Sequence, residues 1–143
     1  MKKHNENGFS LLEVLAVVVI LGIIASIAVP AISSTIENNK KDSYVATAQI
    51  MIDQTRFSIV LNDNSVDAND DDKYSLAELI AQGYIDTLKS DPWGSTYTAA
   101  DSYVSVSGST YSVHLISAAN WRIGTDAAPI AETALERTSV VAQ

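Results

Sequence analysis

The sequence contains no cysteine, and it is short of positive charge. The absence of cysteine excludes disulfides, thiolate zinc sites and a thiol nucleophile, but it does not decide the compartment, because many exported proteins lack disulfides. The 143 residues include 9 Lys and Arg against 17 Asp and Glu, which gives a formal net charge of −8. Because nucleic-acid binding depends largely on neutralising phosphates, no direct binding to a nucleic acid is expected. The length suits one compact domain.

Charge is almost absent from one long segment near the N-terminus. Within Phe9–Ile36, Glu13 is the only ionisable residue. As a helix, Phe9–Pro30 would extend about 33 Å, close to the roughly 30 Å hydrocarbon core of a bilayer. Lys2 and Lys3 precede it, so the positive-inside rule leaves the N-terminus in the cytoplasm. The segment therefore has the length and composition of a membrane-spanning helix.

Two ordinary interpretations of this segment are open. A secretory signal peptide would be cut after Ala28, but Glu13 at the start of its apolar region and the apolar residues beyond Ala28 disfavour it. A plain signal anchor would tolerate Glu13 near the interface, where the carboxylate would have no role. Neither interpretation explains why a carboxylate stands there.

A third interpretation follows from the order Gly8-Phe9-Ser10-Leu11-Leu12-Glu13 and the apolar run after it. This order resembles the N-terminal signature of type IV pilins and type II secretion pseudopilins. The resemblance implies that a prepilin peptidase cuts between Gly8 and Phe9 and methylates the new amine of Phe9. It divides the chain into a leader, residues 1–8, a transmembrane and assembly helix, residues 9–36, and a pilin-like head, residues 37–143.

Glu13 also has a physical reason to be there if the leader is removed. A carboxylate in lipid costs about 2.5–3.5 kcal/mol on insertion scales, so it is expected to have a partner. Cleavage creates one, because the amine of Phe9 in one copy can pair with Glu13 of another and set the axial register. Pairing of the two groups within one chain, one helical turn apart, is the alternative.

Gly22 and Pro30 are the helix breakers of the segment. Proline lacks the backbone donor and clashes with the preceding turn, so a kink or a locally melted stretch is expected at Pro30. The resemblance implies that the stretch between these two residues unwinds on assembly. A simply kinked membrane helix is the alternative.

The rest of the chain predicts an α+β fold. An apolar stripe at helical spacing continues the helix to Leu61 as an amphipathic half, and it consists of Val45, Ala48, Ile52, Thr55 and Ile59. Alternating residues in 103–106 and 111–116 predict an antiparallel hairpin, with 121–123 as a third strand. Residues 91–94, Asp-Pro-Trp-Gly, predict a turn that also resembles one in major pseudopilins. A short helix is expected at 133–137.

An acidic loop between Asn62 and Lys73 raises the question of a metal. Several residues here stand at the spacing of an EF-hand loop, and the candidate ligands are Asp67, Asn69, Asp71 and Glu78, with Ser75 and the carbonyl of Lys73. Asp72 stands where such loops need glycine, and Ser75 with Glu78 also forms a capping box for a helix at 76–82 ended by Gly83. Calcium is therefore the alternative to a solvated acidic loop, and no other cofactor is expected.

A second calcium site, in the C-terminal region, belongs to calcium-binding major pseudopilins. Asp126 is the acidic residue in the corresponding part of this chain, but it has no carboxylate near it in the sequence. That site is therefore not expected here.

Catalysis is disfavoured. His114 is the only histidine beyond residues 1–8, and the sequence contains no Gly-x-Ser-x-Gly, His-Glu-x-x-His or phosphate-binding loop. The main hypothesis is a structural subunit of a type IV pilus-like filament. One alternative is a major pseudopilin of a type II secretion or competence DNA-uptake system, and another is a monomeric membrane-anchored binding protein.

The resemblance also implies partners and a location. The partners would be further copies of the chain in a helical homopolymer, a prepilin peptidase, an assembly ATPase and a membrane platform protein. The chain would span the cytoplasmic membrane once before assembly and stand at the cell surface in a filament afterwards.

Overall fold

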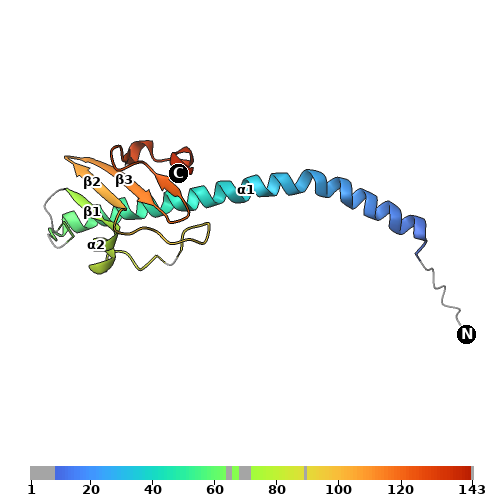
Figure 1. The fold of residues 1–143 in the computed structure, drawn as a ribbon, viewed down its shortest axis with the longest axis horizontal. Helices are drawn as coiled ribbons and strands as arrows, with labels where there is room; N and C mark the ends of the chain where they lie inside the picture. Colours follow the sequence, from blue (N-terminus) through green and yellow to red (C-terminus); the bar gives the residue numbers. More distant parts are fainter. Residues whose placement is uncertain (1–8, 64–65, 68–71, 89, 143) are drawn as a thin grey trace, which may run out of the picture. The chain divides into compact units, whose positions relative to one another are not determined.

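The computed structural model describes residues 9–63, 66–67, 72–88 and 90–142. The chain divides into two compact units, Met1–Glu37 and Asn38–Gln143, and each is described separately. One helix, α1 (Leu11–Val60), contributes to both (Figure 1). The expected long helix is therefore confirmed except for its outermost residues.

The first unit consists of the N-terminal part of α1. The helix begins after Ser10, whose Oγ accepts a hydrogen bond from the backbone N–H of Glu13 at 3.2 Å, as a capping side chain does. The backbone stays helical through Gly22 and Pro30, so of the two expectations for Pro30, a kink or a locally melted stretch, the single chain does not show the melted stretch. Unwinding of this stretch on assembly stays a prediction.

Hydroxyl groups near Pro30 are bound to the helix itself. Ser26 Oγ donates to the carbonyl of Ile23 at 2.7 Å, and Ser33 Oγ donates to that of Val29 at 3.1 Å. Thr35 Oγ1 donates to the carbonyl of Ala31 at 3.0 Å. These polar side chains therefore need no partner from outside the helix.

The second unit places an antiparallel sheet against the C-terminal half of α1 (Figure 1). The strand order is β1-β2-β3-β4-β6, and β5 also pairs with β3. The strands are β1 (Lys73–Ser75), β2 (Tyr103–Ser107), β3 (Thr110–Ile116), β4 (Trp121–Ile123), β5 (Ile130–Ala131) and β6 (Val140–Ala142). The predicted hairpin and third strand are confirmed, as is the α+β architecture.

The helix α2 (Leu76–Ala81) follows β1 directly. Its predicted capping box is present: Ser75 Oγ accepts from the N–H of Glu78 at 3.1 Å, and the Glu78 carboxylate accepts from the N–H of Ser75 at 3.0 Å. Gly83, at φ +78°, ends the segment as expected. Strand β1 was not predicted, because its residues lie at the edge of the acidic loop.

The core lies between α1 and the inner face of the sheet. On the helix, the buried side chains are Tyr44, Ala48, Met51, Ile52, Thr55 and Ser58. On the other elements, they include Val104, Val113, Leu115, Ile123, Leu76 and Leu79. The predicted stripe is confirmed for Ala48, Ile52 and Thr55, whereas Ile59 is 36% exposed.

An aromatic cluster joins the Asp-Pro-Trp-Gly turn to the sheet and to α1. Asp91 Oδ1 accepts hydrogen bonds from the N–H groups of Trp93 at 2.9 Å and Ser95 at 2.8 Å, which confirms the predicted turn. The turn stacks Trp93 on Trp121 with their ring centroids 4.2 Å apart. Tyr44 of α1 meets Trp93 edge-on at 5.8 Å, so both tryptophans are tied to the helix.

The tail does not form the helix expected at 133–137, and that prediction is wrong. Two short 3₁₀ turns stand there instead, η1 (Glu132–Ala134) and η2 (Arg137–Ser139), with extended backbone between them. Contacts with α1 explain the break: Arg56 Nη2 binds Glu132 at 2.7 Å, and Arg137 binds both oxygens of Asp42 at 2.7 and 2.6 Å. These contacts hold the tail so that β6 pairs with β4.

The Asp42–Arg137 pair gives a prediction about pH. Hydrogen bonds from Arg137 lower the pKa of the Asp42 carboxyl from its usual 3.8. Because folding favours the carboxylate, this contribution to stability is present above the unfolded pKa and is lost as the pH falls through the lower folded pKa. NMR titration should give Asp42 a midpoint below 3.8, and Arg137→Gln should raise it toward 3.8. A midpoint that Arg137→Gln leaves unchanged would contradict the pairing.

Candidate assembly helix and head pocket

The first candidate site is the start of α1. Phe9 precedes the helix and is 80% exposed, and Glu13 lies in its first turn. A carboxylate at this end is favoured by the helix dipole. Among the described residues, no ion pair involves Glu13, and Gly8 lies outside them. The start of the helix therefore presents an acid with no charged partner among these residues.

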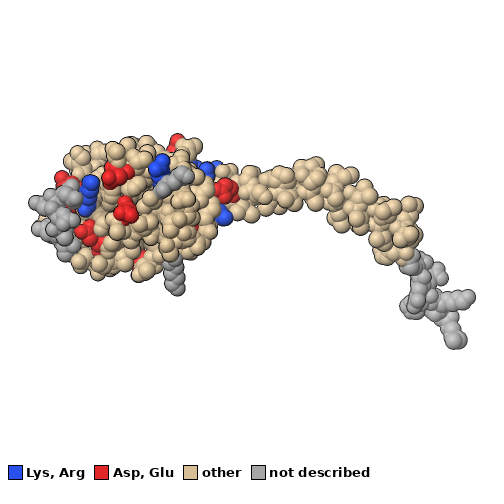
Figure 2. All heavy atoms as spheres, viewed as in Figure 1, with Lys and Arg blue, Asp and Glu red and all other residues tan. Residues whose placement is uncertain are grey.

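The described residues contain one helix that is long and apolar enough to cross a membrane, with a window of mean hydropathy 2.8. None of that window is buried within the chain. The face seen in Figure 2 shows no charged atom along residues 9–36. An apolar surface of this extent requires lipid or other protein to cover it.

A second exposed apolar surface lies within the head, on α1 and on the residue that follows its end at Val60. Ile50, Phe57 and Leu61 are 49%, 53% and 56% exposed. At 100° per residue Ile50 and Phe57 share one side of the helix, away from its buried face, and Leu61 continues that side just after the helix ends. A helix that only covered its own sheet would carry polar residues there.

The predicted EF-hand-type site lies partly outside the described residues and stays a prediction. No group of three or more His, Cys, Asp or Glu residues that could hold a metal ion is found among the described residues. Asn69 and Asp71 lie outside them, whereas Asp67 and Glu78 are described. One carboxylate oxygen of Glu78 is already occupied by Ser75, from its N–H at 3.0 Å and its hydroxyl at 2.7 Å.

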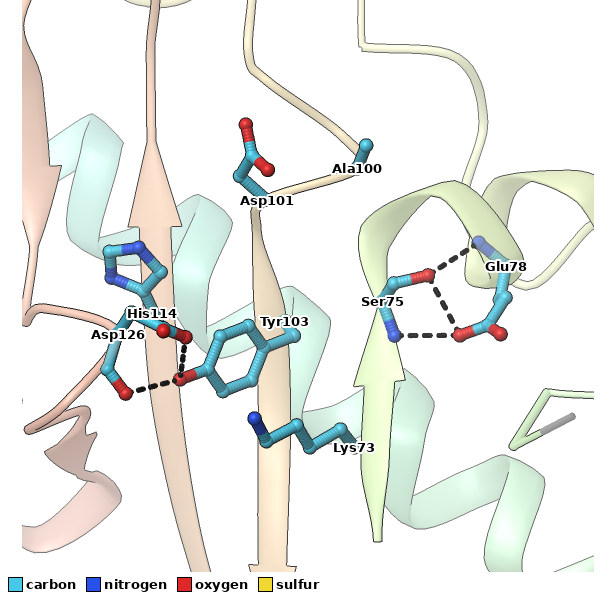
Figure 3. A pocket seen from close by; sticks show the side chains of 8 residues that line it. All are labelled: Lys73, Ser75, Glu78, Ala100, Asp101, Tyr103, His114 and Asp126. Atoms are coloured by element: carbon cyan, nitrogen blue, oxygen red, sulfur yellow. Dashed lines mark hydrogen bonds between the residues drawn. The ribbon is translucent and has the colours of Figure 1, made fainter. Parts of the chain in front are cut away.

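A hollow of about 540 Å³ opens on the sheet face turned away from α1 (Figure 3). It combines residues of β1, β2, β3, α2 and two loops. Its lining consists of Lys73, Ser75, Glu78, Ala100, Asp101, Tyr103, His114 and Asp126. We call it the head pocket.

Two buried polar side chains form the floor of the head pocket. Tyr103 and His114 are direct partners across β2 and β3, and they are only 7% and 6% exposed. The Tyr103 hydroxyl donates toward the carbonyl of Asp126 at 2.9 Å and its Oδ1 at 3.0 Å. Burial, together with Asp126, raises the pKa of Tyr103 to about 12, so the hydroxyl keeps its proton at neutral pH. Lys73 Nζ lies 4.9 Å from the centre of the Tyr103 ring.

The sequence did not predict the head pocket. Asp126 has no carboxylate near it along the chain, yet the fold places Glu78 and Asp101 around the same hollow. The alternation of β2 and β3 places Tyr103 and His114 on the outer face and was a usable signal. Asp101 and Asp126 lie in loops with no periodic pattern, so nothing in the sequence could place them.

Comparisons with known proteins find a family match at the N-terminus and relatives that cover about two thirds of the chain. Residues 3–29 match the family described as Prokaryotic N-terminal methylation motif. The type II secretion system core protein G of Vibrio cholerae serotype O1 is 36% identical over 108 residues, covering 67% of this chain and 71% of that protein. The protein of the same name from Aeromonas hydrophila is 34% identical, covering 68% and 74%. No solved structure gives a significant match.

Proposed function

Because the chain belongs to the family of type II secretion system core protein G, the major pseudopilins, we propose that it is the repeating subunit of a pseudopilus-like filament. The resemblance seen in the sequence is thereby confirmed at the level of the family. The carrying observation is the exposed apolar helix of residues 9–36, which contains Glu13 as its one ionisable side chain. In the filament, copies of this helix would replace lipid around one another.

The relatives support the pseudopilin alternative better than the type IV pilus subunit that the sequence favoured first. These relatives are named as secretion-system proteins, and their similarity extends over about two thirds of this chain, including much of the head. The N-terminal signature is shared by pilins and pseudopilins and cannot separate them. We therefore place the chain in a short secretion-type filament rather than a long surface fibre.

The proposal includes how the subunit is made and where it acts. A prepilin peptidase would cut after Gly8, and the chain would be held in the cytoplasmic membrane by residues 9–36 before assembly. An assembly ATPase and a membrane platform protein would drive polymerisation. The role is structural rather than catalytic, and it uses no cofactor.

The exposed side of α1 in the head fits this role. Ile50, Phe57 and Leu61 carry no charge and stay about half exposed, although the ring of Phe57 meets that of Tyr84 edge-on at 6.2 Å. A heterologous contact between this side and a neighbouring copy would extend into an open filament rather than a closed ring. The apolar segment 9–36 of another copy has the chemistry to cover it.

Mass spectrometry of the mature chain from the native membrane tests the proposal. The expected N-terminus is Phe9, carrying one additional methyl group on its amine. A Gly8→Val variant should keep residues 1–8 and should yield no filaments, because the amine of Phe9 is never released. A mature chain that starts at Val29 would instead make the segment an ordinary signal peptide and overturn the proposal.

A further inference from the structure

The head pocket contains a buried imidazole whose second nitrogen has no hydrogen-bond partner among the described residues. His114 is 6% exposed, and its Nδ1 lies 3.2 Å from the carbonyl oxygen of Ile123. A carbonyl oxygen can only accept, so Nδ1 carries the hydrogen of this bond. In neutral imidazole, Nε2 is then an acceptor. Figure 3 shows the free edge of the ring turned toward the side of the pocket where Asp101 lies.

The other groups of the pocket are also mostly acceptors. Asp101 makes no hydrogen bond through its carboxylate with the described residues, and one oxygen each of Glu78 and Asp126 is not used in the bonds to Ser75 and Tyr103. Three carboxylates against the one ammonium of Lys73 leave a net charge of −2 at the pocket. A ligand that fits must therefore bring hydrogen-bond donors and positive charge.

The arrangement favours an organic cation over a metal ion. The described residues hold no group of three His, Cys, Asp or Glu side chains close enough to ligate a metal. Acceptors spread around a hollow of about 540 Å³ suit a larger planar donor instead. Guanidinium offers several N–H donors in a fixed plane and pairs with carboxylates through two bonds.

We infer that the head pocket binds the guanidinium group of an arginine side chain presented by another polypeptide, with Asp101 and His114 Nε2 as its acceptors. Lys73 lies over the ring of Tyr103 at the other side of the pocket. Its positive charge lowers the affinity of the pocket for a cationic group. Because Asp101 is exposed, the dissociation constant should be roughly millimolar. This inference does not depend on whether the chain forms filaments.

NMR of the full chain in detergent micelles tests the site directly. The chain has 2 histidines, so a His4→Gln variant labelled with ¹⁵N in the imidazole reports on His114 alone. The probe is N-acetyl-arginine methylamide, and the matched control is the citrulline analogue, which has the same shape without the charge. We expect a saturable shift of Nε2 with the arginine probe and none with citrulline.

Variants then assign the acceptors. Asp101→Asn should weaken binding by roughly threefold or more, whereas Asp86→Asn, at an exposed carboxylate outside the pocket, should leave it unchanged. Lys73→Gln should strengthen binding because it removes the positive charge. Equal shifts with both probes, no saturable shift, or a calcium chloride titration that saturates the Nε2 shift at lower concentration would each overturn the inference.

Filament yield distinguishes the source of the arginine. If Asp101→Asn reduces the yield, the arginine belongs to a neighbouring copy, and if the yield is unchanged, it belongs to a different protein. The site itself stands in both cases, because it is judged by the probe titration. Loss of filaments in the Gly8→Val variant concerns the proposed function alone.

Discussion

Replacing Glu13 by leucine is expected to abolish filament assembly while leaving cleavage after Gly8 intact. Glu13 is the one ionisable residue in the apolar segment, and it forms no ion pair among the described residues. In the filament its partner would be the amine of Phe9 from a neighbouring copy. Leaving that amine buried without its carboxylate costs about 3–5 kcal/mol for each contact, which lowers the association constant by more than about 100-fold.

Two measurements follow from the Glu13→Leu substitution. Mass spectrometry should find the same mature N-terminus as in the parent chain, and electron microscopy with sedimentation should find no filaments. Ser10→Ala is the matched control, because it removes the hydroxyl that caps the N–H of Glu13 and keeps the carboxylate. It should cost about 1 kcal/mol of helix stability and still allow assembly. Normal filament yield from Glu13→Leu would leave a membrane-anchored monomer or a same-chain pairing as the better interpretation.

Ile52→Ala is expected to destabilise the head by about 2–5 kcal/mol, whereas Ile50→Ala should change its stability by less than about 1 kcal/mol. The two isoleucines stand two residues apart on α1, with the same helix propensity. Ile52 is fully buried against the sheet, and Ile50 is 49% exposed on the opposite side. Truncating Ile52 leaves a cavity, but truncating Ile50 removes a side chain that water already reaches.

Unfolding by urea, followed through the fluorescence of Trp93 and Trp121, separates the two variants. Both tryptophans lie in the cluster that Tyr44 joins to α1, so their emission reports on helix–sheet contact. Filament yield should show the reverse order if the outer side of α1 packs on a neighbouring copy: Ile50→Ala lowers it although the head stays folded. Equal destabilisation by the two substitutions would mean that α1 buries a different face.

The helix and the hairpin were predictable because their signals are periodic. Ala48, Ile52 and Thr55 recur at helical spacing, and residues 103–106 and 111–116 alternate around a short turn, so local pattern and final packing agree. The capping box of Ser75 and Glu78 was likewise predictable from the sequence, since it depends on two residues three positions apart.

The tail and the head pocket were not predictable, because their residues are placed by partners distant in the sequence. Arg137 is held by Asp42 and Glu132 by Arg56, and these contacts override the weak helical preference of 133–137. At Pro30 the sequence predicts a kink or a locally melted stretch, and the backbone of the single chain stays helical there although the proline removes one backbone donor. Strand β1 is defined by its pairing with β2, which comes later in the sequence.

The hydroxyls of Ser26, Ser33 and Thr35 have a consequence for how a subunit changes surroundings. Each donates to a carbonyl of its own helix, so its hydrogen bond is the same in lipid and among neighbouring helices. For the residues after Glu13, moving between the two environments therefore exchanges mainly apolar contacts, which are similar on both sides. Their transfer contributes little free energy in either direction, and the pairing of Glu13 with a neighbouring amine then supplies the polar part of the gain on assembly. A filament built from such helices can lose a subunit once that one contact is broken, so its length is decided by the machinery that adds and removes subunits.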